Sequence, residues 1–267
     1  MNIRTYYEKT ASMCFHASWI ALIIAVCFFI LHASNLFQGN ILAITTPFLI
    51  VSIVQFTGSR IYEHRMKDLP AEYATRASSP LETKDILLTF MPAPTLRVLL
   101  FHPDGSLLGE IKDRNMHWFM WMVPNSLSMI MPKRYILTDA DGEVLAEYML
   151  KGGISPALSI INGNGSPIGT YKENLRESFI RIKGMIYTAD GNEWIPVNVG
   201  GLLTVFELKT AAGKPIAAFQ KGWMPLDWGK RFKDLNTPIL TFHEKATAND
   251  KIAFFGFCAS AFNHRSN

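Results

Sequence analysis

The sequence predicts a mainly β protein, in which a closed antiparallel β-barrel of about 12 strands surrounds a C-terminal hydrophobic helix and follows two N-terminal transmembrane helices. Three observations predict this fold. Two long apolar runs lie near the N-terminus, tight-turn signals recur through the middle of the chain, and the last apolar run is apolar on every side. Because a helix without a polar face must be enclosed, we expect the strands to close around it.

The N-terminal 60 residues predict a transmembrane hairpin. Residues 11–33 contain no Asp, Glu, Lys or Arg, and this stretch is long enough to cross a bilayer. A second apolar run predicts a span over residues 37–58, in which Pro47 is expected to kink the helix and not to end it.

The flanking charges predict the orientation of this hairpin. Arg4 and Lys9 precede the first span, Arg60 follows the second, and the turn between the spans is uncharged. Positive residues stay on the cytoplasmic side, so the N-terminus and the C-terminal domain are expected in the cytoplasm of a multi-pass protein of the cell membrane.

Residues 61–84 predict a linker, whose first half can continue the second span as a short helix until Pro70 and Pro80 stop it. Residues 85–267 predict a barrel domain. The apolar fraction of 49%, with only 18% charged residues, exceeds that of an ordinary soluble protein. The net charge of +4 is mild and no Lys/Arg block is dense, which argues against nucleic acid as a partner.

The sequence has three cysteines, an odd number, and all of them lie in apolar runs. We therefore expect them to be small core residues and not ligands of a metal ion.

Five turn signals divide the middle of the chain into hairpins. Asp-Gly and Asn-Gly tolerate the positive φ that two-residue hairpin turns require. The signals are Pro103–Gly105, Ala140–Gly142, Asn162–Gly165, Ala189–Gly191 and Ala211–Gly213. The apolar segments beside them predict strands within 97–111, 134–148, 157–171, 180–197, 202–219 and 239–242.

The terminal run predicts a central helix over residues 250–262, with Asp250 as its N-cap. At this length it is too short to cross a bilayer. A buried strand of a β-sandwich is the alternative that the Phe254–Phe257 centre permits.

The segment Tyr135–Tyr148, the later glycine hairpins and the apolar helix together resemble the tubby C-terminal fold, which phospholipid scramblases and LURP-one-related proteins share. The resemblance covers about residues 84–263. It implies a twelve-stranded barrel that encloses a hydrophobic helix. In tubby-type proteins basic residues on the barrel wall bind phosphoinositides, whereas scramblases carry their membrane helix at or near the C-terminus.

Residues 221–233 are the first candidate binding segment. Basic side chains attract anionic headgroups, and tryptophan prefers the headgroup zone of a bilayer. The alternative is a solvated loop with both tryptophans folded onto the barrel. The lipid headgroup-binding candidates are Lys221, Trp223, Trp228, Lys230, Arg231 and Lys233.

Residues 116–131 are the second candidate. They are rich in methionine and carry Trp118 and Trp121, which are candidates for contact with a membrane or a partner protein. The alternative is a pair of barrel strands whose alternate residues face the core.

No catalytic, metal-binding or cofactor-binding motif occurs in the sequence, so we do not expect an enzyme. We expect a membrane-anchored binding module at the cytoplasmic face, which recognises anionic lipid headgroups or a membrane protein partner. A lipid scramblase or lipid-processing protein is one alternative, and an interaction subunit of a membrane complex is another.

Overall fold

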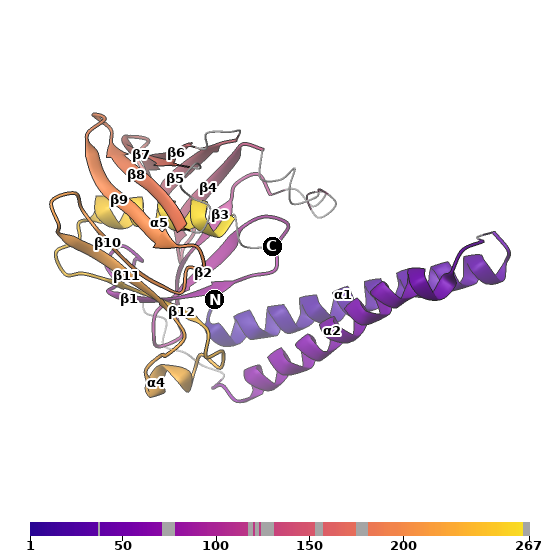
Figure 1. Cartoon of the computed structure of the whole chain (residues 1–267). Coiled ribbons are helices and arrows are strands. Elements are labelled where there is room, and N and C mark those ends of the chain that lie inside the picture. Colours follow the sequence, from indigo (N-terminus) through magenta and orange to yellow (C-terminus); the bar gives the residue numbers. More distant parts are fainter. Residues whose placement is uncertain are drawn as a thin grey trace. The chain divides into compact units, whose positions relative to one another are not determined.

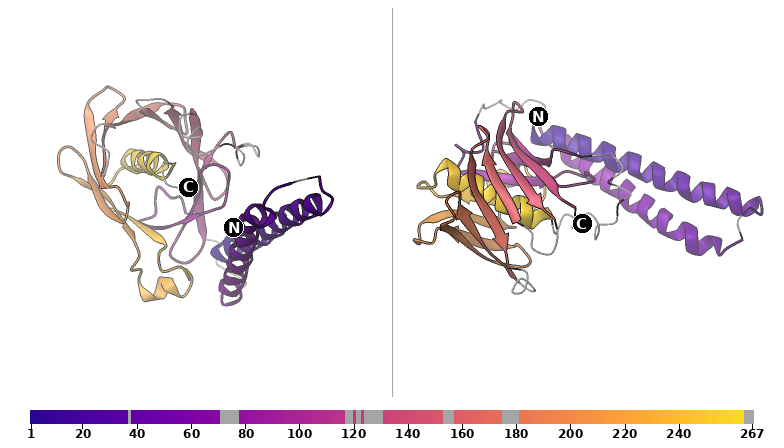
Figure 2. Two further views of the ribbon diagram at one scale, coloured as in Figure 1. Left: turned by 45° about the vertical axis from the view of Figure 1, so that its right-hand side comes forward. Right: turned by 90° about the horizontal axis from the view of Figure 1, so that it is seen from above.

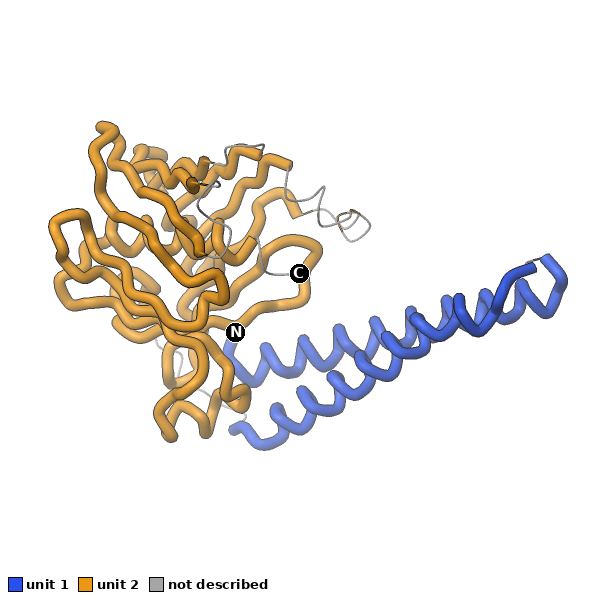
Figure 3. Tube along the Cα trace, viewed as in Figure 1, with its two compact units in different colours: residues 1–73 blue, residues 74–267 orange. Residues whose placement is uncertain are grey.

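The computed structural model describes residues 1–36, 38–70, 78–116, 120, 123, 131–152, 157–174 and 181–263. The chain divides into two compact units, Met1–Tyr73 and Ala74–Asn267 (Figure 3). The first unit is helical and the second is mainly β (Figure 1).

The first unit consists of helices α1 (Ile3–Ala33) and α2 (Ile41–Lys67). Among the described residues, these two helices are long and apolar enough to cross a membrane. The second begins later than the predicted span because Asn40 caps it, its side chain accepting a hydrogen bond from the Ala43 N–H at 3.2 Å. It continues through Pro47 and on to Lys67, into the stretch that the sequence assigns to a linker.

The two helices pack through aromatic rings near one end, where Tyr62 of α2 meets Tyr6 and Tyr7 of α1, and through small side chains along their middle. Ser18 and Ser52 are buried and their hydroxyl oxygens lie 3.2 Å apart, while Ala21 and Ala25 are also buried. Large apolar side chains on both helices are exposed instead, among them Trp19, Ile20, Ile23, Ile53 and Val54. Small residues inside and large apolar residues outside are the pattern of paired helices in a bilayer.

The second unit is a barrel of twelve antiparallel strands, which confirms the predicted fold class. Neighbouring strands are hydrogen-bonded in the order β10-β11-β12-β1-β2-β3-β4-β5-β6-β7-β8-β9, so the barrel is nearly closed. The strands are β1 (Asp85–Phe90), β2 (Arg97–Phe101), β3 (Leu107–Asp113), β4 (Lys133–Asp139), β5 (Val144–Lys151), β6 (Ala157–Asn162), β7 (Pro167–Glu173), β8 (Arg181–Thr188), β9 (Glu193–Gly200), β10 (Val205–Lys209), β11 (Pro215–Lys221) and β12 (Pro238–Phe242).

All five predicted turns occur, but the prediction of two-residue turns is wrong. In the first, the His102 N–H donates to the Ser106 carbonyl at 2.9 Å, which leaves three residues in the loop. Only its glycine, Gly105, has a positive φ (88°), whereas a two-residue type I′ turn requires two such residues. Two further differences concern strands: β1 was not assigned from sequence, and β10 begins at Val205 and not at Leu202.

Helix α5 (Ala248–Asn263) runs inside the ring of strands (Figure 2). This segment is helical and every residue from Asp250 to Asn263 is buried. The alternative, a buried strand of a β-sandwich, is therefore wrong. Asp250 is not the N-cap as predicted. The Thr247 hydroxyl accepts a hydrogen bond from the Asp250 N–H (3.2 Å), and the Asp250 carboxylate accepts one from the Thr247 N–H (2.8 Å). This reciprocal pair is a capping box, with Thr247 as the cap.

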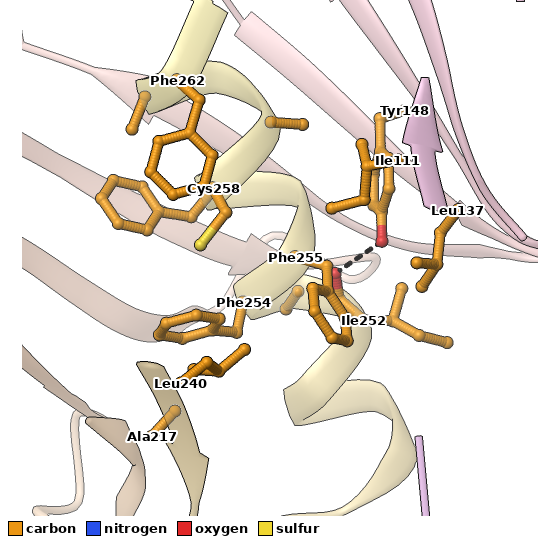
Figure 4. Packing of buried hydrophobic residues seen from close by; sticks show 14 of the residues in the cluster. Ile111, Leu137, Tyr148, Ala217, Leu240, Ile252, Phe254, Phe255, Cys258 and Phe262 are labelled. Carbon is orange, nitrogen blue, oxygen red and sulfur yellow. Dashed lines mark hydrogen bonds between the residues drawn. The ribbon is translucent and has the colours of Figure 1, made fainter. Parts of the chain in front are cut away.

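The helix packs against aromatic side chains of the strands. The rings of Phe206 and Phe219 stack at 4.8 Å between centroids, and Phe206 also stacks on Phe254 of α5. On another side of the helix, the Tyr148 hydroxyl donates a hydrogen bond to the Ile252 carbonyl at 3.0 Å (Figure 4). This bond satisfies a phenol that is fully buried, and burial raises the pKa of Tyr148 well above its usual value.

The barrel is not closed by a strand ladder between β9 and β10. Within the described part of the chain, β9 and β10 are connected by a backbone hydrogen bond at one end. The Ala211 N–H, just beyond β10, donates it to the Trp194 carbonyl of β9 at 2.8 Å. Helix α5 bridges the two edges instead, because Asp250 accepts hydrogen bonds from the Trp194 indole (3.2 Å) and from Lys214 (3.3 Å). The enclosed helix therefore takes part in closing the barrel that surrounds it.

Candidate functional site

The two ends of the barrel differ in their connections. The five glycine turns all lie at one end. At the other end lie the connections from β9 to β10 and from β11 to β12, because Lys221 at the end of β11 pairs with Pro238 at the start of β12. These two connections are neighbours, since the Lys221 N–H donates a hydrogen bond to the Thr204 carbonyl at 2.7 Å.

The β11–β12 connection, residues 222–237, carries most of the predicted headgroup site and is referred to here as the basic loop. It contains a single turn of helix, α4 (Leu226–Gly229), and projects outward from the ring of strands in Figure 2. One side chain anchors it: Phe232 is fully buried, and its ring meets that of Phe101 edge-on with centroids 6.1 Å apart. The Phe232 N–H also donates to the Trp228 carbonyl at 2.8 Å, which fixes α4 to the anchor.

The anchor leaves the predicted site residues at different depths. Trp223 is 91% exposed, and Lys221 and Lys230 are also exposed. Trp228, Arg231 and Lys233 are half-buried. The structure therefore brings all six predicted residues into one connected segment, and it presents Trp223 most fully to the outside.

The backbone at Trp223 is held in an unusual conformation. Its φ is 57°, in the left-handed region that non-glycine residues rarely adopt, and it follows Gly222 with a φ of 79°. The Gln220 side-chain amide donates to the carbonyls of both residues, at 3.2 and 3.1 Å. These bonds stabilise a backbone turn that directs a large aromatic side chain into the surroundings of the molecule.

The charge of this segment is basic. From Lys221 to Leu235, four basic and two acidic residues leave a net charge of +2. A hydrogen bond from Lys230 to Asp227, at 2.7 Å, lowers the pKa of that carboxyl group. Because both side chains are strongly exposed, this ion pair is weak and leaves Lys230 accessible to an anion.

Sequence reasoning missed two residues of the basic loop. Leu226 is 91% exposed and Leu235 is 73% exposed, although both are large and apolar. The available signal was Leu226 between the two tryptophans and Leu235 just after the last lysine of the segment, neither of them in an alternating strand pattern. The second predicted contact, Trp118 and Trp121, lies outside the described residues.

Basic residues on the barrel wall are paired with glutamates. Arg97 and Lys112 both bind Glu110, and in a similar way Arg114 and Arg134 bind Glu147. Burial raises the pKa of Glu110, but the bonds and charges of Lys112 and Arg97 outweigh that effect and hold the pKa below its usual value. These cations are neutralised in part by their own neighbours. In addition, no group of three or more His, Cys, Asp or Glu side chains suited to a metal ion occurs among the described residues.

Comparison with known proteins gives a fold neighbour and no family. No protein-family model matches the chain, and no curated protein matches it. The X-ray structure of an Arabidopsis thaliana protein, AT5G01750, is similar with a TM-score of 0.42 and 11% sequence identity, over 69% of this chain and 91% of that chain. At this identity the similarity carries no information about ligands.

Proposed function

We propose that this protein is a membrane-anchored binding module that recognises anionic lipid headgroups. In this proposal α1 and α2 cross the bilayer, the barrel lies on the cytoplasmic side, and the basic loop contacts the headgroups. The observation that carries the proposal is Trp223, 91% exposed on a stabilised left-handed turn, beside exposed Lys221 and Lys230.

The physical argument combines two weak attractions with a tether. Each basic residue near an anionic surface contributes about 1 kcal/mol, and tryptophan favours the interface because its ring is apolar and its N–H is polar. Neither attraction alone is strong enough to hold a free domain at a membrane surface. A barrel joined to membrane helices is always close to the lipid surface, so weak contacts become effective.

We also propose that the barrel belongs to the tubby-like superfamily. The twelve antiparallel strands, the glycine hairpins and the enclosed C-terminal helix support this membership. It is an analogy of fold and assigns no role to any residue.

The headgroup contact is tested with the full-length protein in nanodiscs of neutral lipid, mixed with sucrose-loaded vesicles and sedimented. We expect binding to vesicles that contain phosphatidylserine, weakened by salt, and little binding to phosphatidylcholine vesicles. Lys230→Glu with Arg231→Glu should reduce binding severalfold.

The matched control is Lys209→Glu with Lys245→Glu, which makes the same change of net charge near the glycine turns. Lys209, like Lys230, is an exposed lysine in an ion pair, here with Glu207. We expect this control to bind as the unchanged protein does. Equal binding to both lipids, or equal loss in both double variants, would overturn the proposal.

The orientation is tested by labelling in sealed right-side-out membrane vesicles, in a background of Cys14→Ala and Cys27→Ala. A membrane-impermeant maleimide should react with Asn35→Cys, in the turn between the helices, without permeabilisation. It should react with Lys245→Cys only after permeabilisation. The opposite pattern contradicts a cytoplasmic barrel.

A further inference from the structure

The connection between β9 and β10 exposes apolar residues beside the basic loop. Leu202 is 80% exposed and Val205 is 68% exposed, although Leu203 between them is buried in the core. Leu203 has a φ of 47°, again in the left-handed region. This turn buries one leucine and directs its apolar neighbours outward.

Hydrogen bonds and strand register join this turn to the basic loop. Val205 is the register partner of Gln220, the residue whose side-chain amide holds the carbonyl of Trp223. In addition, Thr204 accepts the backbone bond from Lys221. The two connections are thus joined at their bases and lie at the same end of the barrel. The exposed apolar side chains at this end are called the apolar tip: Leu202, Val205, Trp223, Leu226 and Leu235.

The apolar tip has no equivalent elsewhere in the described part of the barrel unit. There, every large apolar side chain that is more than two-thirds exposed belongs to these two connections or, in the case of Val205, to the first position of β10. The glycine turns at the other end use Gly at the positive-φ position, whereas here Leu203 and Trp223 adopt it at a cost of about 1 kcal/mol each. Exposed apolar surface and backbone strain at the same edge indicate a surface built for contact.

We propose that the apolar tip inserts into the headgroup–acyl boundary of the bilayer, while the basic residues stay at the headgroups. This inference rests on the proposed function and extends it to a second chemistry, that of the hydrocarbon boundary. Basic side chains that border an apolar surface match a bilayer, which presents anionic groups above hydrocarbon.

The test measures depth at the two ends of β10. An environment-sensitive fluorophore is attached to Leu202→Cys or to Ala212→Cys in the full-length protein, in a background of Cys14→Ala and Cys27→Ala. Cys258 is buried and stays in place. Ala212 is the matched control, because it is exposed in the glycine turn at the opposite end of the same strand. Each protein is reconstituted into vesicles with lipids brominated near the headgroup.

We expect the brominated lipids to quench the probe at residue 202 severalfold more than the probe at residue 212. Equal quenching at the two positions would overturn the insertion. A blue-shifted probe at residue 202 without lipid quenching, more pronounced at higher protein-to-lipid ratio, would assign the tip to a second copy of the chain and also overturn it.

The same probe separates this inference from the proposed function. An unquenched probe at residue 202, in a protein that still sediments with phosphatidylserine vesicles, rejects insertion and leaves headgroup binding in place. Quenching that is equal in neutral and anionic lipid, and unchanged by Lys230→Glu with Arg231→Glu, supports insertion and rejects headgroup recognition.

Discussion

Gly256 of α5 shows how one residue determines the packing of the barrel interior. A Cβ at this position would lie 3.0 Å from two carbons of the Tyr148 ring and 3.3 Å from the Leu158 side chain. Without it, the ring lies against the helix and its hydroxyl reaches the Ile252 carbonyl one turn earlier. The hydrogen bond at the far end of the ring restricts its movement away from an added methyl group.

Gly256→Ala is therefore predicted to destabilise the protein. Alanine favours a helix by about 1 kcal/mol over glycine, but overpacking a filled core costs about 1–3 kcal/mol. We expect a lower thermal unfolding midpoint for the full-length protein in detergent, measured by tryptophan fluorescence. Ser260→Ala, in the next turn of α5, is the control because it adds no volume. An unchanged or higher midpoint for Gly256→Ala would show that Tyr148 moves freely.

At the scale of elements, the buried ring of Phe232 anchors the basic loop. Phe232 is fully buried against Phe101, whereas Leu235, three residues later, is exposed. The hydroxyl of Thr237 and the side chain of Asp234 form local bonds at the end of the loop. We expect loss of the anchor ring to release the loop without unfolding the strands, because the bonds at Asp234 and Thr237 lie within the loop itself.

Phe232→Ala is predicted to increase trypsin cleavage after Lys230 and Arg231 severalfold. The reason is that cleavage requires local opening, which the buried ring opposes. Mass spectrometry of the fragments locates the cut. Leu235→Ala, an apolar truncation in the same loop, should leave the cleavage rate unchanged; a similar increase in both variants would show that Phe232 is not the anchor.

At the scale of the whole molecule, the barrel unit depends on a helix for closure. Backbone ladders join eleven pairs of strands. The remaining gap between β9 and β10 is spanned by the backbone bond from Ala211 to Trp194 and by Asp250, which binds Trp194 of β9 and Lys214 in the turn after β10. Asp250 itself is buried and completes the capping box of α5. The same carboxylate thus links the start of the helix to both edges of the gap.

Asp250→Asn is predicted to loosen this closure. It removes the charge that faces Lys214, and we expect a loss of about 1–3 kcal/mol in the free energy of unfolding. Amide hydrogen exchange should rise more in β9 and β10 than in β3 and β4, which lie in the middle of the ladder. Asp190→Asn, in an exposed glycine turn, is the control. Uniformly faster exchange in all strands would indicate general destabilisation and no specific role at the gap.

Features that depend on local chemistry could be predicted from the amino-acid sequence. Gly105 and the glycines of the other four turns predict hairpins, because glycine adopts a positive φ without steric cost. Helix α5 is apolar on every side, which predicts that it is enclosed, because none of its faces is suited to contact with water. The glycine hairpins, the enclosed helix and the two long apolar helices follow from such signals, whereas the number of twelve strands came from the resemblance to the tubby fold. The lysines and tryptophans of the candidate site were found in the same way.

Which apolar side chains remain exposed depends on contacts between distant parts of the chain. Phe232 and Leu226 are both apolar residues of one loop, yet one is buried and the other is exposed, because burial depends on which wall of the barrel the loop reaches. Likewise, Leu202 fits a strand by its neighbours, but β10 begins later and leaves it in the turn. Strand register and the hydrogen bonds of Asp250 join residues that are far apart in the chain. A local sequence pattern does not show which distant residues will meet.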